Sequence, residues 1–317
     1  ALDANTEGNY NSAFGYNSLG ANTTGTHNTA LGDFSQAANT TGTKNVSVGQ
    51  GSFISNTTGD NNTVVGTEAL DQNTTADNNT AVGFQSLKAN TTGADNTAIG
   101  YATLTANTTG TLNTASGSNA LRYNTTGDNN VAVGRLALYL NTTADANTAV
   151  GRSALEANTT GANNTAVGFG ALDANTTAAN NTAVGSAALG ANTTGTQNTA
   201  LGQGAGQSSV SAGQCTFIGG EAGNACTGSA NTLLGFKAGA YQLDLTSGTS
   251  NTIVGAYCDT TAADSVNAMC LGYNLDAAAG YTTLGSGTSD IRAAHGTATW
   301  ATVSDERYKK DIVDSTA

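Results

Sequence analysis

The sequence predicts an all-β fold, a parallel β-solenoid (β-roll) built from 17-residue coils, and three observations lead to it. The pentad Asn-Thr-Ala-Val-Gly or a close variant restarts every 17 residues, twelve times in perfect phase from Asn11 to Asn198. Such a fixed period is typical of solenoids, in which each unit packs only against its neighbours. The pentads are short, often β-branched and closed by glycine, which favours strands that end in turns. An α-helix, with its period of 3.6 residues, cannot accommodate so much Gly, Asn and Thr.

Two apolar positions recur in each unit. The fourth pentad residue is apolar in every unit but one, where Ser116 replaces it, and a second apolar residue follows five positions later but fails at Gln36 and Gly206. We therefore expect two short strands per coil, each with one large core residue. The fourth-position residues are Phe14, Leu31, Val48, Val65, Val82, Ile99, Val133, Val150, Val167, Val184 and Leu201, and the second set is Leu19, Phe53, Leu70, Leu87, Leu104, Leu121, Leu138, Leu155, Leu172 and Leu189.

The rest of each unit is Asn-Thr-Thr-Gly or Asn-Thr-Thr-Ala, as in 22–25 and 192–195. These residues tolerate left-handed backbone and cap their own turns, so we expect turns there. Coils that stack at about 4.8 Å place identical residues above one another, and asparagine amides can then form a hydrogen-bonded ladder. We interpret the pentad asparagine as such a structural ladder and not as a row of ligand-binding amides.

Composition limits the classes of partner. The chain has 317 residues, 22 acidic against 10 basic side chains and a net charge of −12, without a basic stripe, so no nucleic-acid partner is expected. It has no stretch of 18 apolar residues, so no membrane insertion is expected either. Ala and Val supply most of the apolar share, and a coil with so thin a core should gain from burying a face against other copies. We therefore expect the chain to associate with copies of itself, without cofactor or metal.

The cysteines all follow the regular repeats. Their spacing lacks a CxxC motif, and the two histidines are far apart, so a zinc site is not expected. Buried free thiols are the favoured interpretation, and disulfide bonds stay open. The residues are Cys215, Cys226, Cys258 and Cys270.

Three regions follow from the repeat pattern. Residues 1–202 form a regular solenoid shaft, residues 203–290 form irregular coils that act as a cap or a binding region, and residues 291–317 differ in kind. Pentad-like segments recur in the second region at spacings of 17, 16, 20, 17 and 13 residues. The chain begins in the middle of a unit, so we expect the native N-terminus to lie upstream of Ala1.

The repeats resemble the NTAVG-type repeats of tail-fibre-domain proteins from phages and bacteria. They are more distantly similar to the heads of trimeric autotransporter adhesins, which are left-handed parallel β-rolls packed as trimers. The unit length departs from those adhesin heads, which usually have shorter coils. The resemblance implies a homotrimeric fibre.

A second, shorter resemblance lies near the C-terminus. Residues 304–312, Ser-Asp-Glu-Arg-Tyr-Lys-Lys-Asp-Ile, match the S-D-x-R-x-K-x-x-I opening of the endosialidase-type intramolecular chaperone of phage tail spikes and fibres. That family trimerises its fibre and then cuts itself off before the serine. The resemblance implies that residues 291–317 are the junction and the start of a C-terminal chaperone domain. It also implies that Ser304 is the nucleophile, Lys309 assists it, and Val303–Ser304 is the bond cut. A Ser-Asp pair that caps a helix starting near Glu306 is the simpler interpretation.

These observations predict a structural and adhesive fibre, the distal part of a phage tail fibre in the virion, which binds a host-surface glycan or protein. The alternative is a bacterial surface adhesin or extracellular filament of the trimeric autotransporter type. An ice-binding solenoid is more remote, because Thr23 and Thr24 are adjacent and lie in an expected turn. A glycan-cleaving spike is also remote, because no paired carboxylate motif stands out. Apart from autoproteolytic release at the C-terminus, no enzymatic activity is expected.

Overall fold

The computed structural model describes residues 1–296 and 301–302. Within that part the regular secondary structure consists of strands alone, so the protein is all-β, a parallel β-solenoid as predicted. The chain divides into two compact units, Ala1–Thr194 and Gly195–Ala317.

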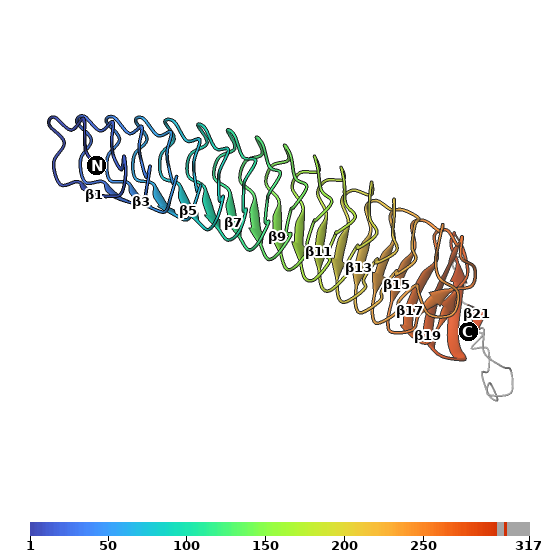
Figure 1. Cartoon of the computed structure of the whole chain (residues 1–317). Coiled ribbons are helices and arrows are strands. Elements are labelled where there is room, and N and C mark those ends of the chain that lie inside the picture. Colours follow the sequence, from blue (N-terminus) through green and yellow to red (C-terminus); the bar gives the residue numbers. More distant parts are fainter. Residues whose placement is uncertain (297–300, 303–317) are drawn as a thin grey trace. The chain divides into compact units, whose positions relative to one another are not determined.

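The first unit is a stack of near-identical coils, each with one three-residue strand (Figure 1). Successive strands pair in parallel with a shift of one repeat, as in Thr80↔Thr97 and Val82↔Ile99. The predicted register is therefore confirmed. The strands are β1 (Ser12–Phe14), β2 (Thr29–Leu31), β3 (Val46–Val48), β4 (Thr63–Val65), β5 (Thr80–Val82), β6 (Thr97–Ile99), β7 (Thr114–Ser116), β8 (Val131–Val133), β9 (Thr148–Val150), β10 (Thr165–Val167) and β11 (Thr182–Val184).

The prediction of a second strand in each of these coils is wrong. The segment around the recurring leucine is a series of turns in which left-handed residues alternate, for example Gln85 (φ 55°) and Leu87 (φ 52°). Left-handed backbone cannot continue an extended strand. The leucines are nonetheless fully buried, so their predicted place in the core is confirmed.

The other predicted core position, the fourth pentad residue, is wrong as well. The inward residue of each strand is the third residue of the pentad, which is the middle residue of the strand. Examples are Ala81, Ala98 and Val64, all completely buried. The fourth residue lies on the opposite face, because side chains alternate along a strand. The core of a regular coil therefore combines a small strand residue with the leucine of the turn segment.

The predicted asparagine ladder is confirmed, and there are two of them. In the pentad ladder, the Asn130 backbone N–H donates to Oδ1 of Asn113 at 3.0 Å, and Nδ2 of Asn113 donates to the Gly127 carbonyl at 2.8 Å. In the ladder of the Asn-Thr-Thr turns, Nδ2 of Asn124 donates to Oδ1 of Asn107 at 2.8 Å and to Gly127 O at 2.9 Å. Both ladder asparagines of one coil thus share one carbonyl acceptor.

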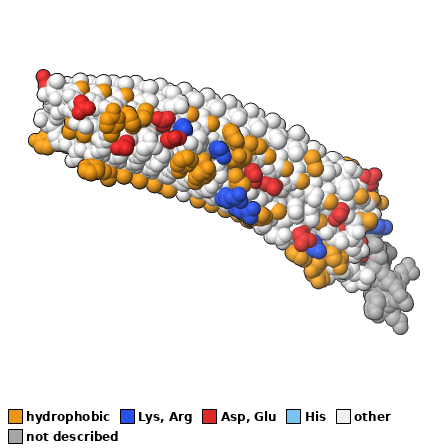
Figure 2. Space-filling model, viewed as in Figure 1, with side chains coloured by type: hydrophobic (Ala, Val, Ile, Leu, Met, Phe, Trp, Pro, Cys, Tyr) orange, Lys and Arg blue, Asp and Glu red, His pale blue; other side chains and the backbone are white. Residues whose placement is uncertain are grey.

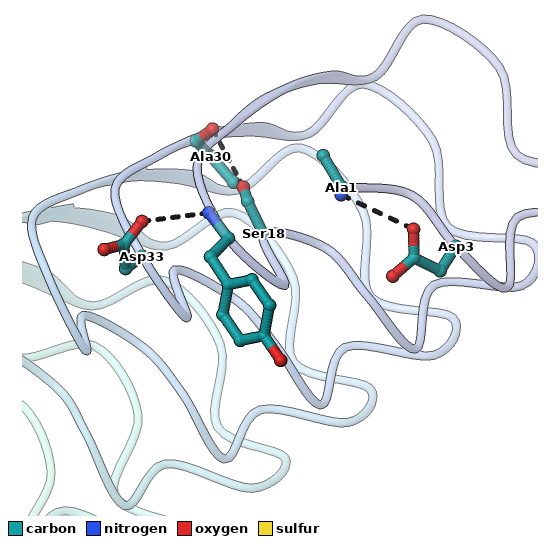
Figure 3. A network of polar contacts seen from close by, with 6 residues as sticks. Ala1, Asp3, Ser18, Ala30 and Asp33 are labelled. Carbon is teal, nitrogen blue, oxygen red and sulfur yellow. Dashed lines mark hydrogen bonds and ion pairs between the residues drawn. The ribbon is translucent and has the colours of Figure 1, made fainter.

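Other contacts also join each coil to the next. The hydroxyl of Ser18 donates to the Ala30 carbonyl at 3.1 Å, and the backbone N–H of Tyr16 donates to Oδ1 of Asp33 at 2.9 Å (Figure 3). The pentad glycine is required by close approach: Gly83 has φ 132°, and a Cβ there would lie 2.3 Å from the carbonyl oxygen of Gly100. Only glycine fits such a position.

The second unit continues the pentad-based strands with uneven coils. Strand partners such as Thr216↔Thr232, Thr232↔Thr252 and Met269↔Thr282 confirm the predicted spacings of 16, 20 and 13 residues. A second, two-stranded parallel sheet appears here, and an antiparallel hairpin follows the last parallel pair. The main strands are β12 (Thr199–Leu201), β13 (Thr216–Ile218), β14 (Thr232–Leu234), β15 (Thr252–Val254), β17 (Met269–Tyr273), β19 (Tyr281–Ser286), β20 (Ser289–Ala294) and β21 (Ala301–Thr302), and the small sheet is β16 (Asp259–Thr260) with β18 (Asp276–Ala277).

Candidate functional site

The residues predicted for autoproteolysis lie outside the described part of the chain. Ser304, Lys309 and the Val303–Ser304 bond all fall within residues 303–317, which the structure does not describe. Their roles therefore stay predictions of the resemblance, and the candidate surfaces come from elsewhere.

The first candidate surface is an outward apolar row along the strands of the first unit. It consists of the fourth pentad residues, which the sequence had placed in the core and which instead face outward. Phe14 is 76% exposed, Leu31 45% and Ile99 44%. In Figure 2, hydrophobic side chains follow the edge of this unit along which Figure 1 draws the strands. The row is Phe14, Leu31, Val48, Val65, Val82, Ile99, Val133, Val150, Val167 and Val184, interrupted by Ser116.

Beside this row, and on the same face, lie the second pentad residues. All of them are exposed or half-buried, and all are threonines except Ser12, Val46 and Val131. The expectation that Thr23 and Thr24 lie in a turn is confirmed, but outward threonines do exist on the strands. The face therefore has a Thr-x-aliphatic pattern and not Thr-x-Thr. The threonines are Thr29, Thr63, Thr80, Thr97, Thr114, Thr148, Thr165 and Thr182.

The second candidate surface is an aromatic cluster in the second unit, formed by Phe236, Tyr241, Tyr257 and Tyr273. Tyr257 lies at its centre, with ring centroids 5.4, 4.7 and 5.9 Å from Phe236, Tyr241 and Tyr273. The three outer rings are substantially exposed, Tyr273 to 55%. Phe236, Tyr257 and Tyr273 come one or two residues after pentad glycines, and Tyr241 lies in the 20-residue coil. In the sequence, only the variability of these positions could have indicated a binding surface.

A buried carboxylate holds one edge of this cluster. Oδ2 of Asp259 accepts the backbone N–H groups of Tyr241, Gln242 and Leu243 at 3.1, 3.0 and 3.2 Å. Burial raises the pKa of Asp259 above its usual value. The hydrogen bonds fix the loop that presents Tyr241 and Leu243 to solvent.

The third candidate is a polar pocket of about 260 Å³ in the second unit. Residues around β18 form one wall and the β19–β20 hairpin forms the other, so that Asp276, Asp290 and Arg292 line one hollow. Burial and the neighbouring charge of Asp259 raise the pKa of Asp276. The guanidinium of Arg292 also lies over the ring of Tyr281, 5.3 Å from its centroid. The other lining residues are Thr261, Asn274, Leu275, Ala278, Thr283 and Gly287.

The sequence reasoning missed this pocket because its acidic residues are separated in the chain and no motif joins them. It did predict the surrounding irregular coils as a cap or binding region. Among the described residues, no group of three or more His, Cys, Asp or Glu side chains could hold a metal ion. The same residues include no helix long and apolar enough to cross a membrane.

Comparisons with protein-family models, with curated proteins and with solved structures find no match for this chain.

Proposed function

We propose that this protein is a structural and adhesive fibre, a homotrimer that forms the distal part of a phage tail fibre and binds a receptor on the host surface. The observation that carries the proposal is the outward apolar row. A contiguous apolar surface of this kind marks an interaction site on a soluble protein. Burial of apolar surface contributes about 25 cal/mol per Å², so a row repeated over many coils favours association strongly.

A second copy of the same chain is the partner that best fits the row. The row repeats with the coil, so a partner with the same repeat can match it side chain for side chain. Closed symmetric assemblies bury such a face equally on every subunit. The choice of three subunits rests on the resemblance to trimeric fibres and adhesin heads.

The second unit supports the adhesive part of the proposal. The polar pocket offers carboxylates, a guanidinium, a hydroxyl and an amide within one hollow, and such convergent polar groups fix the orientation of a ligand. The exposed rings of the aromatic cluster offer flat apolar surface. A glycan needs both kinds of contact, since its hydroxyls require hydrogen bonds and its ring faces are apolar.

Sedimentation velocity tests the assembly. We expect the wild type to sediment as a trimer and the row variant Ile99→Lys/Val133→Lys to sediment as a monomer with an unchanged circular dichroism spectrum. The matched control is Leu112→Lys/Leu140→Lys, which places two lysines at exposed apolar positions outside the row and should stay trimeric. A monomeric wild type, or a trimeric row variant, contradicts the proposal.

The polar pocket also favours a second candidate, a glycan-cleaving spike. It brings Asp276 and Asp290 into one hollow, and glycosidases use two carboxylates, one with a raised pKa. Release of reducing ends from host-surface glycans, abolished by Asp276→Asn or Asp290→Asn, would support cleavage. Binding to those glycans without such release supports the adhesive fibre.

The Thr-x-aliphatic face keeps the ice-binding alternative testable. Measurement of thermal hysteresis on the wild type and on Ile99→Lys/Val133→Lys decides it. Hysteresis that this variant loses would support ice binding, and its absence in the wild type removes that alternative. A bacterial surface adhesin shares the proposed assembly and differs in location, so recovery of the chain from phage particles or from cell envelopes separates the two.

Autoproteolytic release is a further part of the proposal. It assigns Ser304 as nucleophile and Lys309 as its assisting group, because a lysine with a lowered pKa can activate a serine. Mass spectrometry of the chain recovered from its native source tests it. A C-terminus at Val303 supports cleavage, and a chain that continues intact through Ser304 contradicts it.

A further inference from the structure

The four cysteines occupy positions at which the repeat geometry brings two side chains together. Cys215 stands at the pentad asparagine position, and Cys226 stands at the asparagine position of the Asn-Thr-Thr turn in the same coil. In a regular coil these two side chains are those of Asn113 and Asn124, which both donate to the carbonyl of Gly127. One coil has thus replaced both of its ladder asparagines with cysteine.

The contacts of this pair follow the same geometry. Sγ of Cys215 and Sγ of Cys226 each donate to the carbonyl oxygen of Gly228 at 3.4 Å. Both side chains are buried. The two sulfur atoms therefore lie beside the same carbonyl oxygen.

The second pair joins neighbouring coils. Cys258 stands at the small position between the pentad glycine and the buried leucine, and Cys270 is the inward residue of β17 in the following coil. In the first unit, Ser35 and Ser47 hold the same two positions, and Ser35 Oγ donates to the Ser47 carbonyl at 3.1 Å. The Cys258 and Cys270 thiols are free and buried, and Sγ of Cys270 donates to the Leu275 carbonyl at 3.3 Å.

We propose that these residues form two disulfide bonds, Cys215–Cys226 within one coil and Cys258–Cys270 between adjacent coils. The oxidant is a small-molecule or protein disulfide. One cysteine thiolate attacks it to give a mixed disulfide and one thiol, and the second cysteine then displaces the other thiol. Each bond thus converts two protein thiols and one oxidant disulfide into one protein disulfide and two oxidant thiols.

The disulfide bonds form during folding, before the second unit has adopted its final structure. All four thiols are buried in the folded unit. A thiol that the oxidant cannot reach reacts slowly, because exchange requires direct attack of the sulfur on the oxidant disulfide. The oxidant therefore acts while the second unit is still open, and folding then buries the bonds. This inference does not depend on the proposed fibre function.

Peptide mapping tests the pairing. The full chain is refolded from denaturant with oxidised and reduced glutathione, alkylated, and digested without reduction by a protease that cuts after Asp and Glu. Glu221, Asp244, Asp259 and Asp264 place each cysteine on a separate peptide. We expect two linked peptide pairs, 215 with 226 and 258 with 270. Four alkylated thiols, or any other pairing, would overturn the proposal.

Matched variants come from the repeats themselves. Cys215→Asn/Cys226→Asn restores the residues of a regular coil, and Cys258→Ala/Cys270→Ala restores residues such as Ala137 and Ala149 at the corresponding positions. Each variant should fold, lose its own linked peptide pair and keep the other. In a folded variant, the two unchanged cysteines could instead be found as alkylated thiols or in other disulfides. That result would show that the repeat positions do not determine the pairing, and it would overturn the proposal.

Discussion

At the residue scale, the pentad glycine tolerates no side chain. Gly83→Ala forces a Cβ to within 2.3 Å of the Gly100 carbonyl oxygen and places alanine at φ 132°. We expect a loss of stability of about 3 kcal/mol or more. Urea unfolding followed by circular dichroism measures it.

Gly51 supplies the control, since its φ is 62° and a Cβ there would meet nothing within 4 Å. Gly51→Ala should cost only about 1 kcal/mol, the usual penalty for a left-handed alanine. Equal losses in the two variants would mean that backbone conformation alone, and not the close approach of neighbouring coils, selects glycine.

The ladder asparagines make a second prediction. Asn113→Ala leaves the buried backbone N–H of Asn130 and the carbonyl of Gly127 with fewer partners. Each unsatisfied buried group costs about 1–3 kcal/mol, so we expect a clear drop in the unfolding midpoint. Thr109→Ala, at an exposed turn position one coil earlier, should change the midpoint little. A similar drop in both variants would contradict a special role for the ladder.

The sequence predicted residue roles unevenly, and for a physical reason. The ladder and the buried leucines follow from stacking identical coils, because stacking places like residues in contact. Which residue of a three-residue strand faces inward could not be predicted in the same way. Ala81 and Val82 are both apolar, so hydrophobicity alone does not show which of them lies in the core. The wide leucine side chain already fills the narrow coil, so the strand contributes its small residue to the core and its large one to the surface.

At the element scale, one complete coil is the unit of insertion or deletion. Deletion of residues 96–112 joins Asp95 to Asn113 and restores every strand in register with its new neighbour. The variant should stay folded and give the same spectrum per residue. Deletion of residues 96–103 alone shifts the register and should unfold the coils around it, which limited proteolysis with mass spectrometry would detect as new cleavage near the junction.

Carboxylates in the second unit predict a pH dependence. Burial raises the pKa of Asp259, and burial together with the charge of Asp259 raises that of Asp276. A folded-state pKa above the unfolded value of about 3.9 stabilises the fold at low pH, and this contribution is lost as pH rises through the folded-state pKa. The thermal midpoint should therefore rise as the pH falls through the raised folded-state pKa values toward about 3.9.

Asp276→Asn serves as the control for this effect. It removes one of the two interacting charges, so the midpoint should depend less on pH than in the wild type. Asp71 and Asp173 in the first unit also have pKa values raised by burial and add a background of the same sign in both proteins. An identical pH dependence in wild type and variant would contradict the role of this pair.

The elements of the second unit mark the limit of sequence reasoning. The uneven coil lengths were predicted because the pentads are still recognisable. The β16–β18 sheet and the β19–β20 hairpin were not, because their pairing depends on turns without a repeat to align them. The polar pocket was missed for the same reason, since its two walls come from these elements.

At the scale of the whole molecule, the balance of charge and apolar surface predicts how association responds to salt. Each copy carries a net charge of −12, and three ion pairs occur among the described residues, so copies repel one another electrostatically. The outward apolar row attracts them by a force that salt does not screen. Between about 0.1 M and about 1 M sodium chloride the Debye length falls from about 10 Å to about 3 Å, which removes most of the repulsion. Association should therefore stay equal or become tighter, as measured by sedimentation equilibrium at both concentrations. Dissociation at the higher concentration would mean that ion pairs hold the copies together and that the apolar row is not the interface.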